Sequence, residues 1–436
     1  MVTHAHQYHN LIDDIVSMSG QSNQRSASME GPTSVRVRNI QGFLEGTNFQ
    51  ALSDYSPNRE MATPMTELPK QVLDIYDVLE KLNMELKYVK SGSTGHTFCA
   101  VSKSDPKMRM AVKVSAYPKK RFGHMDDLAR PENVELVVLS FLSRFVTSRR
   151  TPHLVLPITA FRTHIDRFIG FSDLQKHSSI YNSFVRRYHK GKFEPYVSVL
   201  FSEWCEGGDL LDYVRENYKV MTQSVWEVIF MQLLLTLTAI HKKYPGFRHN
   251  DLKANNVLVQ YTQNRTKLKT YRYTLDNHEF LVPDIALEIK IWDFDFACID
   301  GIISNSKLQE TWTDEHNITC KQNRYYDMHF FFSSLAWGKW FRGFNRKYIP
   351  EPIIEFVERI IPEELRPVYR MQTVTKKRKN RKTGIYERYQ EEELMQLNTR
   401  LGPGGRVANN REYTTPQRIL LTDPLFAKYR QIAVRD

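Results

Sequence analysis

Apolar positions divide this chain into a sparse N-terminal stretch and a patterned remainder. The first 70 or so residues are rich in Ser, Thr, Asn, Gln and Pro, and residues 20–32 carry almost no large apolar side chain. So little apolar surface cannot offset the conformational entropy that is lost when a segment becomes ordered. We therefore expect residues 1–72 to form a largely disordered arm, in which Ile40 and Phe43 are the apolar side chains available as a short anchor.

From about Leu73 onward, the apolar positions follow the spacings of strands and helices. Short apolar runs and alternation predict strands, whereas apolar residues three or four positions apart predict helices. The predicted strands lie within residues 88–100, 110–114, 153–161 and 196–204, with short strands near 257 and at 289–292. The predicted helices are residues 134–145, 225–240 and 325–340. Strands precede helices along the chain, which favours an α+β fold with segregated elements.

Three stretches interrupt this pattern. Residues 162–194 are aromatic and basic, and residues 260–288 resemble an inserted hairpin with Asp276-Asn277 as its turn. Residues 376–382 read Lys-Lys-Arg-Lys-Asn-Arg-Lys, and like charges at this density repel one another. We expect the first two stretches to be insertions and the third to be an exposed basic loop.

Length and cysteine content bound the fold class. With 436 residues, the chain can bury a sizeable core without disulfides or metals. The four cysteines, Cys99, Cys205, Cys298 and Cys320, follow no C-x-x-C spacing. We therefore predict neither a disulfide framework nor a zinc site, which fits a reducing compartment.

Charge and hydropathy narrow the function classes. The formal net charge of +12 indicates attraction to acidic partners, nucleic acid or an anionic membrane, although solvated Lys and Arg on a soluble surface give the same total. No apolar run approaches the ~20 residues needed to span a bilayer, and the N-terminus lacks the apolar stretch of a signal peptide. We expect a soluble protein that is not secreted, and weak contact of the basic loop with nucleic acid or an anionic membrane stays open.

The strongest chemical signal is the sequence His-Asn-Asp-Leu-Lys-Ala-Asn-Asn at residues 249–256, directly before an apolar run. Phosphoryl transfer needs a carboxylate to orient the attacking hydroxyl, an oxygen ligand for Mg²⁺, and a cation near the migrating group. Asp251, Asn256 and Lys253 supply these three groups within one short loop. The segment resembles the protein-kinase catalytic loop, H-R-D-L-x-x-x-N.

A second acidic motif, Asp293-Phe294-Asp295, follows a short predicted strand. Mg²⁺ takes one or two carboxylate oxygens together with substrate phosphates, so Asp293 is the candidate metal ligand beside Asn256. Phe294 would pack beneath it. The motif resembles the kinase D-F-G element, with Asp295 in place of the glycine.

The nucleotide phosphates need a cation and a close backbone approach. Lys113 lies on a predicted strand after a loop that contains Gly92 and Gly95, and this arrangement resembles the kinase strand lysine and glycine-rich loop. Lys90 stands where the first loop glycine would be. We expect Lys113 to pair with Glu135, which begins an apolar helical face, rather than with the nearby glutamate that follows Pro131.

A kinase-like hinge follows the last strand of this first part. In residues 202–209, the backbone groups of Glu203 and Cys205 are the candidates to bind adenine, and Asp209 would approach the ribose. Ser202 would then be the gatekeeper, and its small side chain predicts an open pocket behind the adenine site. Among the later residues, Asp327 resembles the aspartate that braces the catalytic loop.

The motif Asp293-Phe294-Asp295-Phe296, the insertion before it and the segment Tyr-Tyr-Asp-Met-His-Phe-Phe at residues 325–331 together resemble one kinase branch. This branch is the poxvirus-type virion serine/threonine kinases, which are found in nucleocytoplasmic large DNA viruses. The resemblance covers roughly residues 85–430, is most specific at 249–335, and also includes a closing helix near residues 415–426.

The resemblance implies a two-lobed protein-kinase-like fold. A small strand-rich N-lobe would span residues 73–203, and a larger helical C-lobe would span residues 204–430. It implies a virus-encoded enzyme that transfers the γ-phosphoryl group of ATP to Ser or Thr hydroxyls of proteins, with Mg²⁺ or alternatively Mn²⁺. It places the enzyme in the host cytoplasm or viral factory, or in the virion, with a role in virion assembly.

The sequence departs from the kinase pattern at several places, and these departures lead to further expectations. Asn250 replaces the arginine that usually pairs with an activation-loop phosphate, so we predict activity without phosphorylation of residues 298–324. No A-P-E element is visible, and Asp314-Glu315 is the nearest candidate. Anchoring of the substrate loop is therefore open. Asp295 removes a permissive glycine, which we expect to restrict inactive flips of Phe294.

Three other functions compete with an active protein kinase. A pseudokinase or ATP-binding scaffold would share the fold and the nucleotide site. A small-molecule kinase of the aminoglycoside type would share the catalytic-loop frame, but such enzymes usually lack a lysine at the position of Lys253, which is typical of serine/threonine kinases. A basic nucleic-acid-binding protein would need none of these motifs in this order.

Overall fold

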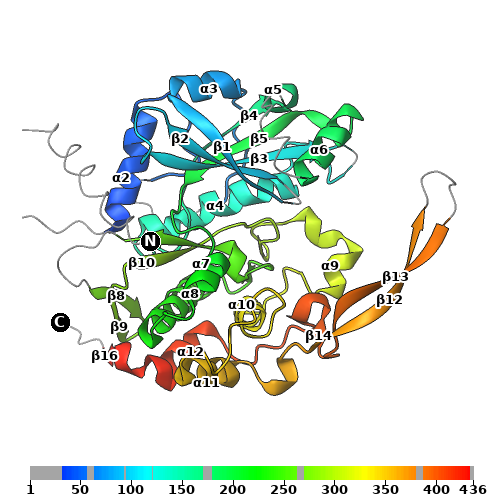
Figure 1. The fold of residues 1–436 in the computed structure, drawn as a ribbon. Coiled ribbons are helices and arrows are strands. Elements are labelled where there is room, and N and C mark those ends of the chain that lie inside the picture. Colours follow the sequence, from blue (N-terminus) through cyan, green and yellow to red (C-terminus); the bar gives the residue numbers. More distant parts are fainter. Residues whose placement is uncertain are drawn as a thin grey trace, which may run out of the picture.

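The computed structural model describes residues 32–55, 63–92, 95–119, 121–169, 179–262, 270–379 and 386–432. A sheet with its flanking helices forms one part of the molecule, and most of the later helices form the other (Figure 1). The order of elements along the chain confirms the predicted mixed α+β class.

The largest sheet comes from the first half of the chain. It has five strands in the order β1-β2-β3-β5-β4, and every neighbouring pair is antiparallel. These strands are β1 Met84–Ser91, β2 His96–Ser102, β3 Arg109–Pro118, β4 Pro157–His164 and β5 Phe193–Glu203. Helix α4, Pro131–Thr147, packs on this sheet (Figure 1). It presents apolar residues such as Val134, Val138 and Leu142 to the core.

Smaller helices surround the sheet. These are α2 Pro32–Glu45, α3 Ile75–Lys81, α5 Ile165–Ile169 and α6 Ser179–His189. Helices α5 and α6 belong to the predicted insertion at residues 162–194, and Phe168 and Tyr181 bury its aromatic side chains against the sheet.

The second part of the molecule is built around α8. Its helices are α7 Leu210–Asn217, α8 Gln223–Lys243, α9 Thr311–Glu315, α10 Tyr326–Ala336, α11 Glu351–Ile360 and α12 Pro416–Thr422. Short 3-10 turns join them: η2 Ala254–Asn256, η3 Ser306–Gln309, η4 Glu363–Leu365, η5 Pro403–Gly405 and η6 Pro424–Tyr429. Side-chain caps fix several starts, because Asp209, Thr222 and Thr415 each accept a backbone N–H from the first turn of the helix that follows.

Helix α8 differs from the expectation that no apolar run approaches the length of a membrane span. By length and composition alone, its 21 residues could cross a membrane, but 83% of its most apolar window is buried inside the protein. Such burial is typical of the core helix of a globular domain.

Small antiparallel strand groups complete the second part. They are β6 Phe247–Arg248 with β11 Cys298–Ile299, β7 Val257–Tyr261 with β10 Leu287–Ile291, β8 Thr270–Leu275 with β9 His278–Pro283 and β16 Arg430–Ile432, β12 Tyr369–Lys379 with β13 Tyr386–Gln396, and β14 Leu401–Gly402 with β15 Arg406–Val407. Strands β8 and β9 form the predicted hairpin in residues 260–288, and its turn lies at Asp276-Asn277 as expected.

The expectation of a largely disordered arm over residues 1–72 is wrong for residues 63–72, where Leu68 is buried, and for residues 32–55. Helix α2 forms here and packs near α4, and Ile40, Leu52 and Tyr55 are buried. The expected anchor is present, since Ile40 is buried and Phe43 packs against the core. A few apolar residues suffice to order this part of the arm because the folded remainder offers a surface. Residues 1–31 lie outside the described part.

The expectation of an exposed basic loop at residues 376–382 also needs correction. Residues up to Lys379 belong to β12, which pairs with β13 in an extended hairpin. Lys376 makes ion pairs with Glu391 and Glu393 on the facing strand. The basic run thus meets acidic residues across the hairpin, and cross-strand opposite charges favour pairing. The rest of the run, residues 380–382, lies outside the described part.

The cysteine prediction is wrong at one pair. Cys298 and Cys320, 22 residues apart, form a disulfide, while Cys99 and Cys205 are free and buried. The pair connects the beginning and end of the segment that follows the second acidic motif. Sequence spacing carried no signal for it, because the fold brings the two residues together.

Candidate active site

Strand β3 carries Lys113 to the centre of a group of carboxylates. Its Nζ lies 2.6 Å from Glu135 on α4, 3.0 Å from Asp293 and 3.2 Å from Asp295. The structure thus pairs Lys113 with Glu135 as predicted, whereas the alternative Glu132 binds Arg130. Three separate motifs of the sequence meet at this one ammonium group.

The charges in this group shift one another's protonation. Burial opposes the charged form of Lys113, but the surrounding carboxylates outweigh it and raise the pKa of Lys113 well above its ordinary value. Burial raises the pKa of Glu135 to about 7, with Asp295 and Asp293 adding to the effect against the attraction of Lys113. For Asp293, burial also acts upward, but Lys113 outweighs it and the pKa of Asp293 is lowered. The lysine therefore stays charged and favours an ionised Asp293.

The catalytic-loop residues converge on Asp251. Its Oδ2 accepts hydrogen bonds from Lys253 Nζ at 2.8 Å and from Asn256 Nδ2 at 3.0 Å. The backbone turns sharply at Asn250, whose φ is 65°, a value that is rare for residues other than glycine. The loop thus gathers the predicted base, cation and metal ligand at one place.

Asp327 on α10 holds the backbone of this loop, as the sequence predicted. Its carboxylate accepts the backbone N–H groups of His249 at 2.7 Å and of Asn250 at 2.8 Å. Asp327 is buried, and this burial raises its pKa. A buried carboxylate with two charge-assisted bonds holds the loop backbone in one position.

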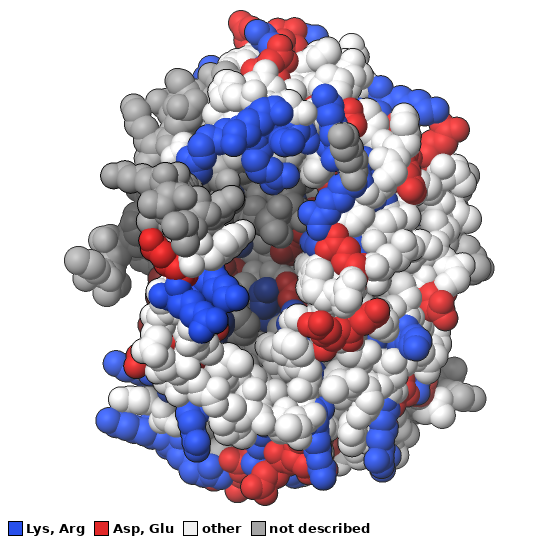
Figure 2. All heavy atoms as spheres, turned by 90° about the vertical axis from the view of Figure 1, so that its right-hand side faces the viewer, with Lys and Arg blue, Asp and Glu red and all other residues white. Residues whose placement is uncertain are grey.

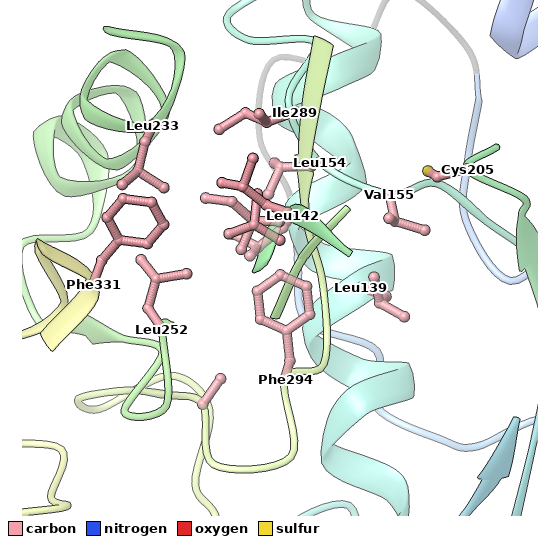
Figure 3. Packing of buried hydrophobic residues seen from close by; sticks show 14 of the residues in the cluster. Leu139, Leu142, Leu154, Val155, Cys205, Leu233, Leu252, Ile289, Phe294 and Phe331 are labelled. Carbon is pink, nitrogen blue, oxygen red and sulfur yellow. The ribbon is translucent and has the colours of Figure 1, made fainter. Parts of the chain in front are cut away.

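The second acidic motif is held by its neighbours on both sides. Asp293 has a φ of 63°, and His249 Nε2 lies 2.9 Å from the carbonyl oxygen of Trp292 just before it. Phe294 is fully buried and packs toward Leu142 and the α4 side of the core (Figure 3). With Phe294 seated in this way, the Asp293 carboxylate faces Lys113.

The glycine-rich loop packs closely on β3. The Gly92 N–H donates to the Gly95 carbonyl at 2.8 Å, and residues 93–94 lie outside the described part. A Cβ added at Gly95 would lie 2.8 Å from both the Val114 carbonyl oxygen and the Ser115 hydroxyl, so only glycine fits there. Lys90, at the place of the first loop glycine, lies 5.0 Å from the centre of the Trp292 ring system.

At the predicted hinge, the side chains have structural partners. Glu203 binds Arg36 of α2 through two bonds of 2.8 and 2.7 Å, and its pKa is lowered because Arg36 outweighs the effect of burial. The Cys205 carbonyl accepts the Gly208 N–H at 3.4 Å. Asp209 caps α7 through the Asp212 N–H and lies 3.9 Å from Lys90. Adenine binding by this backbone stays a prediction.

The chemistry of the site suits a divalent cation with phosphates. One oxygen from each of Glu135, Asp293 and Asp295 lies within 4.8 Å of the others. When all three are ionised, Lys113 leaves an excess of two negative charges, which a divalent metal would neutralise. Asn256 lies beside this group, since its backbone carbonyl accepts the backbone N–H of Trp292 at 3.2 Å. The residues present therefore fit a Mg²⁺ ion and a nucleotide.

The segment at residues 297–324 is held without an A-P-E element, through contacts that the sequence did not predict. Arg324 makes a bidentate ion pair with Glu412. Asn317 donates to the carbonyl groups of Val407 and Asn409 at 3.0 and 3.1 Å. The segment is therefore anchored by residues about 90 positions later, and no motif signals such a pairing.

Asn250 also serves this segment. Its side-chain amide donates to the carbonyl groups of Phe296 at 3.0 Å and Thr319 at 3.2 Å. The residue that replaces the usual arginine thus joins both ends of the segment through neutral hydrogen bonds. This arrangement is consistent with the prediction that no phosphate is needed there.

Comparisons with known proteins agree with this geometry. Residues 210–340 match the family described as Poxvirus serine/threonine protein kinase. A protein of Acanthamoeba polyphaga mimivirus that is named as a serine/threonine-protein kinase is 42% identical over 427 residues, which cover 96% of this chain and 85% of that protein. This chain belongs to the poxvirus-type serine/threonine protein kinase family. The chain is therefore a serine/threonine protein kinase, and the predicted family resemblance is confirmed.

More distant relatives share shorter stretches with this kinase. An uncharacterized protein of the same mimivirus is 25% identical over 260 residues, which cover 58% of this chain and 28% of that protein. The ovarian-specific serine/threonine-protein kinase Lok of Drosophila melanogaster is 28% identical over 110 residues, which cover 25% of this chain and 22% of that protein. Membership in the family implies a protein-kinase-like fold, protein substrates, and the use of ATP with a divalent metal ion.

Proposed function

We propose that this kinase transfers the γ-phosphoryl group of Mg-ATP to Ser and Thr hydroxyls of proteins. The convergence of Lys113, Glu135 and Asp293 beside the catalytic loop is the observation that carries the proposal. The nucleotide would lie between two lobes, the part that contains the large sheet and the helical part.

In this mechanism each predicted site residue has its own role. Lys113 holds the α- and β-phosphates and is itself held by Glu135. Asp293 and Asn256 would hold the metal ion, which when bound would neutralise charge on the phosphates. Asp251 orients the substrate hydroxyl and accepts its proton, and Lys253 steadies the oxygens of the transferred group. Gly92 and Gly95 let the loop backbone approach the phosphates, and the hinge at Glu203, Cys205 and Asp209 binds the nucleoside.

The decisive experiment measures transfer of radiolabelled phosphate from ATP to a generic protein mixture. Asp251→Asn should lower kcat by about 10²- to 10⁴-fold with little change in ATP affinity, since the residue acts mainly in the transition state. Lys113→Met should abolish transfer. Exposed residues of the same types provide matched controls, Asp300→Asn and Lys103→Met. Phosphoamino-acid analysis should show phosphoserine and phosphothreonine. Equal activity of wild type and both site variants would overturn the proposal.

A second candidate function is a pseudokinase or ATP-binding scaffold. It gains some support from Asp251, whose carboxylate is in contact with an arginine, Arg406, in this structure. Nucleotide binding by wild type without any phosphate transfer would favour it.

We further propose that the enzyme is virus-encoded, acts in virion assembly, and is located in the host cytoplasm, the viral factory or the virion. The similarity to the mimivirus protein and to the poxvirus family supports this proposal. Detection of the protein in purified particles, and a loss of particle formation when Asp251→Asn replaces the wild type, would test it.

A further inference from the structure

A basic pocket lies at one end of the large sheet. Its volume is about 480 Å³, and it is lined by Pro118, Lys119, Arg121, Arg187, Lys190 and Lys192. Every lining residue except the proline is a cation. A concave site with lining charges of one sign concentrates ions of the opposite sign.

Strand pairing builds this pocket. Pro118 at the end of β3 is opposite Phe193 at the start of β5, and the Lys119 N–H donates to the Lys192 carbonyl at 2.9 Å. Arg187 lies on α6 and covers the Phe193 ring at 4.7 Å. Arg187 therefore projects from a helix, while Lys119, Arg121, Lys190 and Lys192 project from the turns that follow β3 and precede β5. The pairing of these two strands keeps the cations close together despite their mutual repulsion.

The pocket is also next to the segment that follows the second acidic motif. Arg121 makes an ion pair with Glu310, which precedes α9, and the Ser306 N–H donates to the Ala129 carbonyl at 2.7 Å. Figure 2 shows this face of the molecule, with Lys and Arg side chains gathered in a band above a central hollow. A substrate chain that lies along this segment would pass the pocket.

Arg121 has its partner in Glu310, whereas the structure gives Lys119, Lys190 and Lys192 no ion pair with another described residue. We propose that the pocket binds an acidic segment of the protein substrate, rich in Asp, Glu or phosphorylated residues. This inference rests on the proposed kinase function, because it assigns the substrate class of that same site.

The test uses two serine peptides that differ only in four Asp or four Asn residues beside the serine. Wild type should use the Asp peptide with about tenfold higher kcat/KM, and Lys119→Gln/Lys190→Gln/Lys192→Gln should lose this preference, since several exposed ion pairs together give an effect of this size. The ATP KM should not change. Lys87→Gln/Lys103→Gln/Lys339→Gln removes the same charge from exposed sites elsewhere and should keep the preference.

Fluorescence anisotropy of the labelled Asp peptide without ATP separates docking from catalysis. Weaker binding by the pocket variant supports the inference that the pocket binds the acidic segment. This holds even if wild type transfers no phosphate, an outcome that would overturn only the proposed function. Equal binding by wild type and pocket variant overturns the inference. Tighter binding of single-stranded RNA than of the Asp peptide overturns it in favour of a nucleic-acid partner.

A second inference comes from a different observation, a contact on the candidate base. Arg406 on β15 donates to Asp251 Oδ1 at 2.5 Å, while Lys253 and Asn256 hold Oδ2. Both carboxylate oxygens are thus fixed in orientation. Oδ1 still has capacity for a substrate hydroxyl, because a carboxylate oxygen can accept two hydrogen bonds.

Arg406 is itself held firmly. Its guanidinium lies 3.9 Å from the centre of the Phe330 ring on α10. The preceding turn has positive φ at Gly404 and Gly405, and a Cβ at Gly405 would lie 3.0 Å from the Tyr369 hydroxyl. A turn that only glycine can adopt therefore aims this arginine at the base.

We infer that Arg406 is a positioning residue for Asp251. On this basis Arg406→Gln should lower kcat by about tenfold or more and leave the ATP KM unchanged, and Arg406→Lys should recover part of the loss. In an Asp251→Asn background, Arg406→Gln should have no further effect on kcat. Arg400→Gln, an exposed arginine of the same segment, is the control.

Wild-type activity, measured in parallel, keeps this test separate from that of the proposed function. If wild type transfers no phosphate, the proposed function fails. If wild type is active and Arg406→Gln is equally active, the inference about Arg406 fails. Higher activity of Arg406→Gln would also overturn it, because Arg406 would then block the base.

Discussion

The chemical centre of this kinase and the elements that support it differ in where their residues come from. The residues of the centre lie in short motifs, such as residues 249–256 and 293–295. Two of the supports come from opposite ends of the described chain. Arg36 binds the predicted hinge from α2, and residues 406–412 hold Asp251, the predicted base, and the segment after the second acidic motif. Residues that take part in a reaction must be of particular types at fixed spacing. Residues that hold them in place need only provide partners for buried polar groups.

Asp327 supports the centre from within a motif, so its loss should have the largest effect on kcat. Asp327→Asn keeps the shape but replaces an acceptor oxygen that receives a catalytic-loop N–H. We expect kcat to fall by about 10²-fold through misplacement of the loop, and stability to fall by about 1.5–3 kcal/mol per lost charge-assisted bond. Steady-state kinetics and thermal unfolding measure the two effects. The exposed Asp314→Asn is the control, and unchanged kcat in Asp327→Asn would contradict the prediction.

Arg36 tests the support from the N-terminal side. Arg36→Ala leaves the Glu203 carboxylate, which is 18% exposed, without its cation. We expect a loss of stability that approaches the ~3–5 kcal/mol of a broken buried pair, and a higher ATP KM because the hinge loosens. The double variant Arg36→Ala/Glu203→Gln should recover part of the stability, since the uncompensated charge is gone.

Denaturant unfolding and ATP titration check this prediction. Arg38→Ala, on the same helix and exposed, controls for a general weakening of α2. If Arg36→Ala and Arg38→Ala behave alike, α2 does not support the hinge through this ion pair.

Glu412 tests the support from the C-terminal side, where we expect a smaller effect. The Arg324–Glu412 pair is partly exposed, so Glu412→Gln should cost only about 1 kcal/mol of stability. If the protein substrate lies along this segment as proposed, the KM for protein substrate should rise several-fold while the ATP KM stays constant. Substrate titrations at saturating ATP measure this change. An equal effect of Glu392→Gln on the exposed hairpin would argue against a specific anchor.

The smallest expected effect concerns phosphorylation. Because Asn250 already joins Phe296 and Thr319 through hydrogen bonds, Ser304→Ala/Ser306→Ala/Thr311→Ala should keep activity within about twofold. Treatment of wild type with a phosphatase should leave its activity equally unchanged, which covers the other hydroxyl groups of the segment. A loss above tenfold in a folded protein would show that a phosphate is required.

The sequence by itself determined the family of this protein and predicted the chemistry of its site. Lys113, Asp251, Asn256 and Asp293 could be predicted as site residues because phosphoryl transfer restricts both residue type and spacing, and their roles in catalysis stay predictions. The resemblance of Asp327 to the bracing aspartate of kinases predicted its contact with the loop, and the apolar helical face that Glu135 begins predicted its pairing with Lys113. The structure shows both contacts. Helices and strands with a clear apolar periodicity could also be predicted from the sequence, since burial of one face imposes a period on apolar residues.

Only the tertiary structure decided which distant residues support that chemistry. The Arg36–Glu203 pair, the Arg324–Glu412 anchor, the Arg406–Asp251 contact and the Cys298–Cys320 disulfide join segments whose separate sequences carry no shared signal. The same holds for α2, whose few apolar residues become ordered only against a surface formed by the rest of the chain. Burial and pairing energies depend on the partner that the fold supplies, and a single segment does not specify that partner.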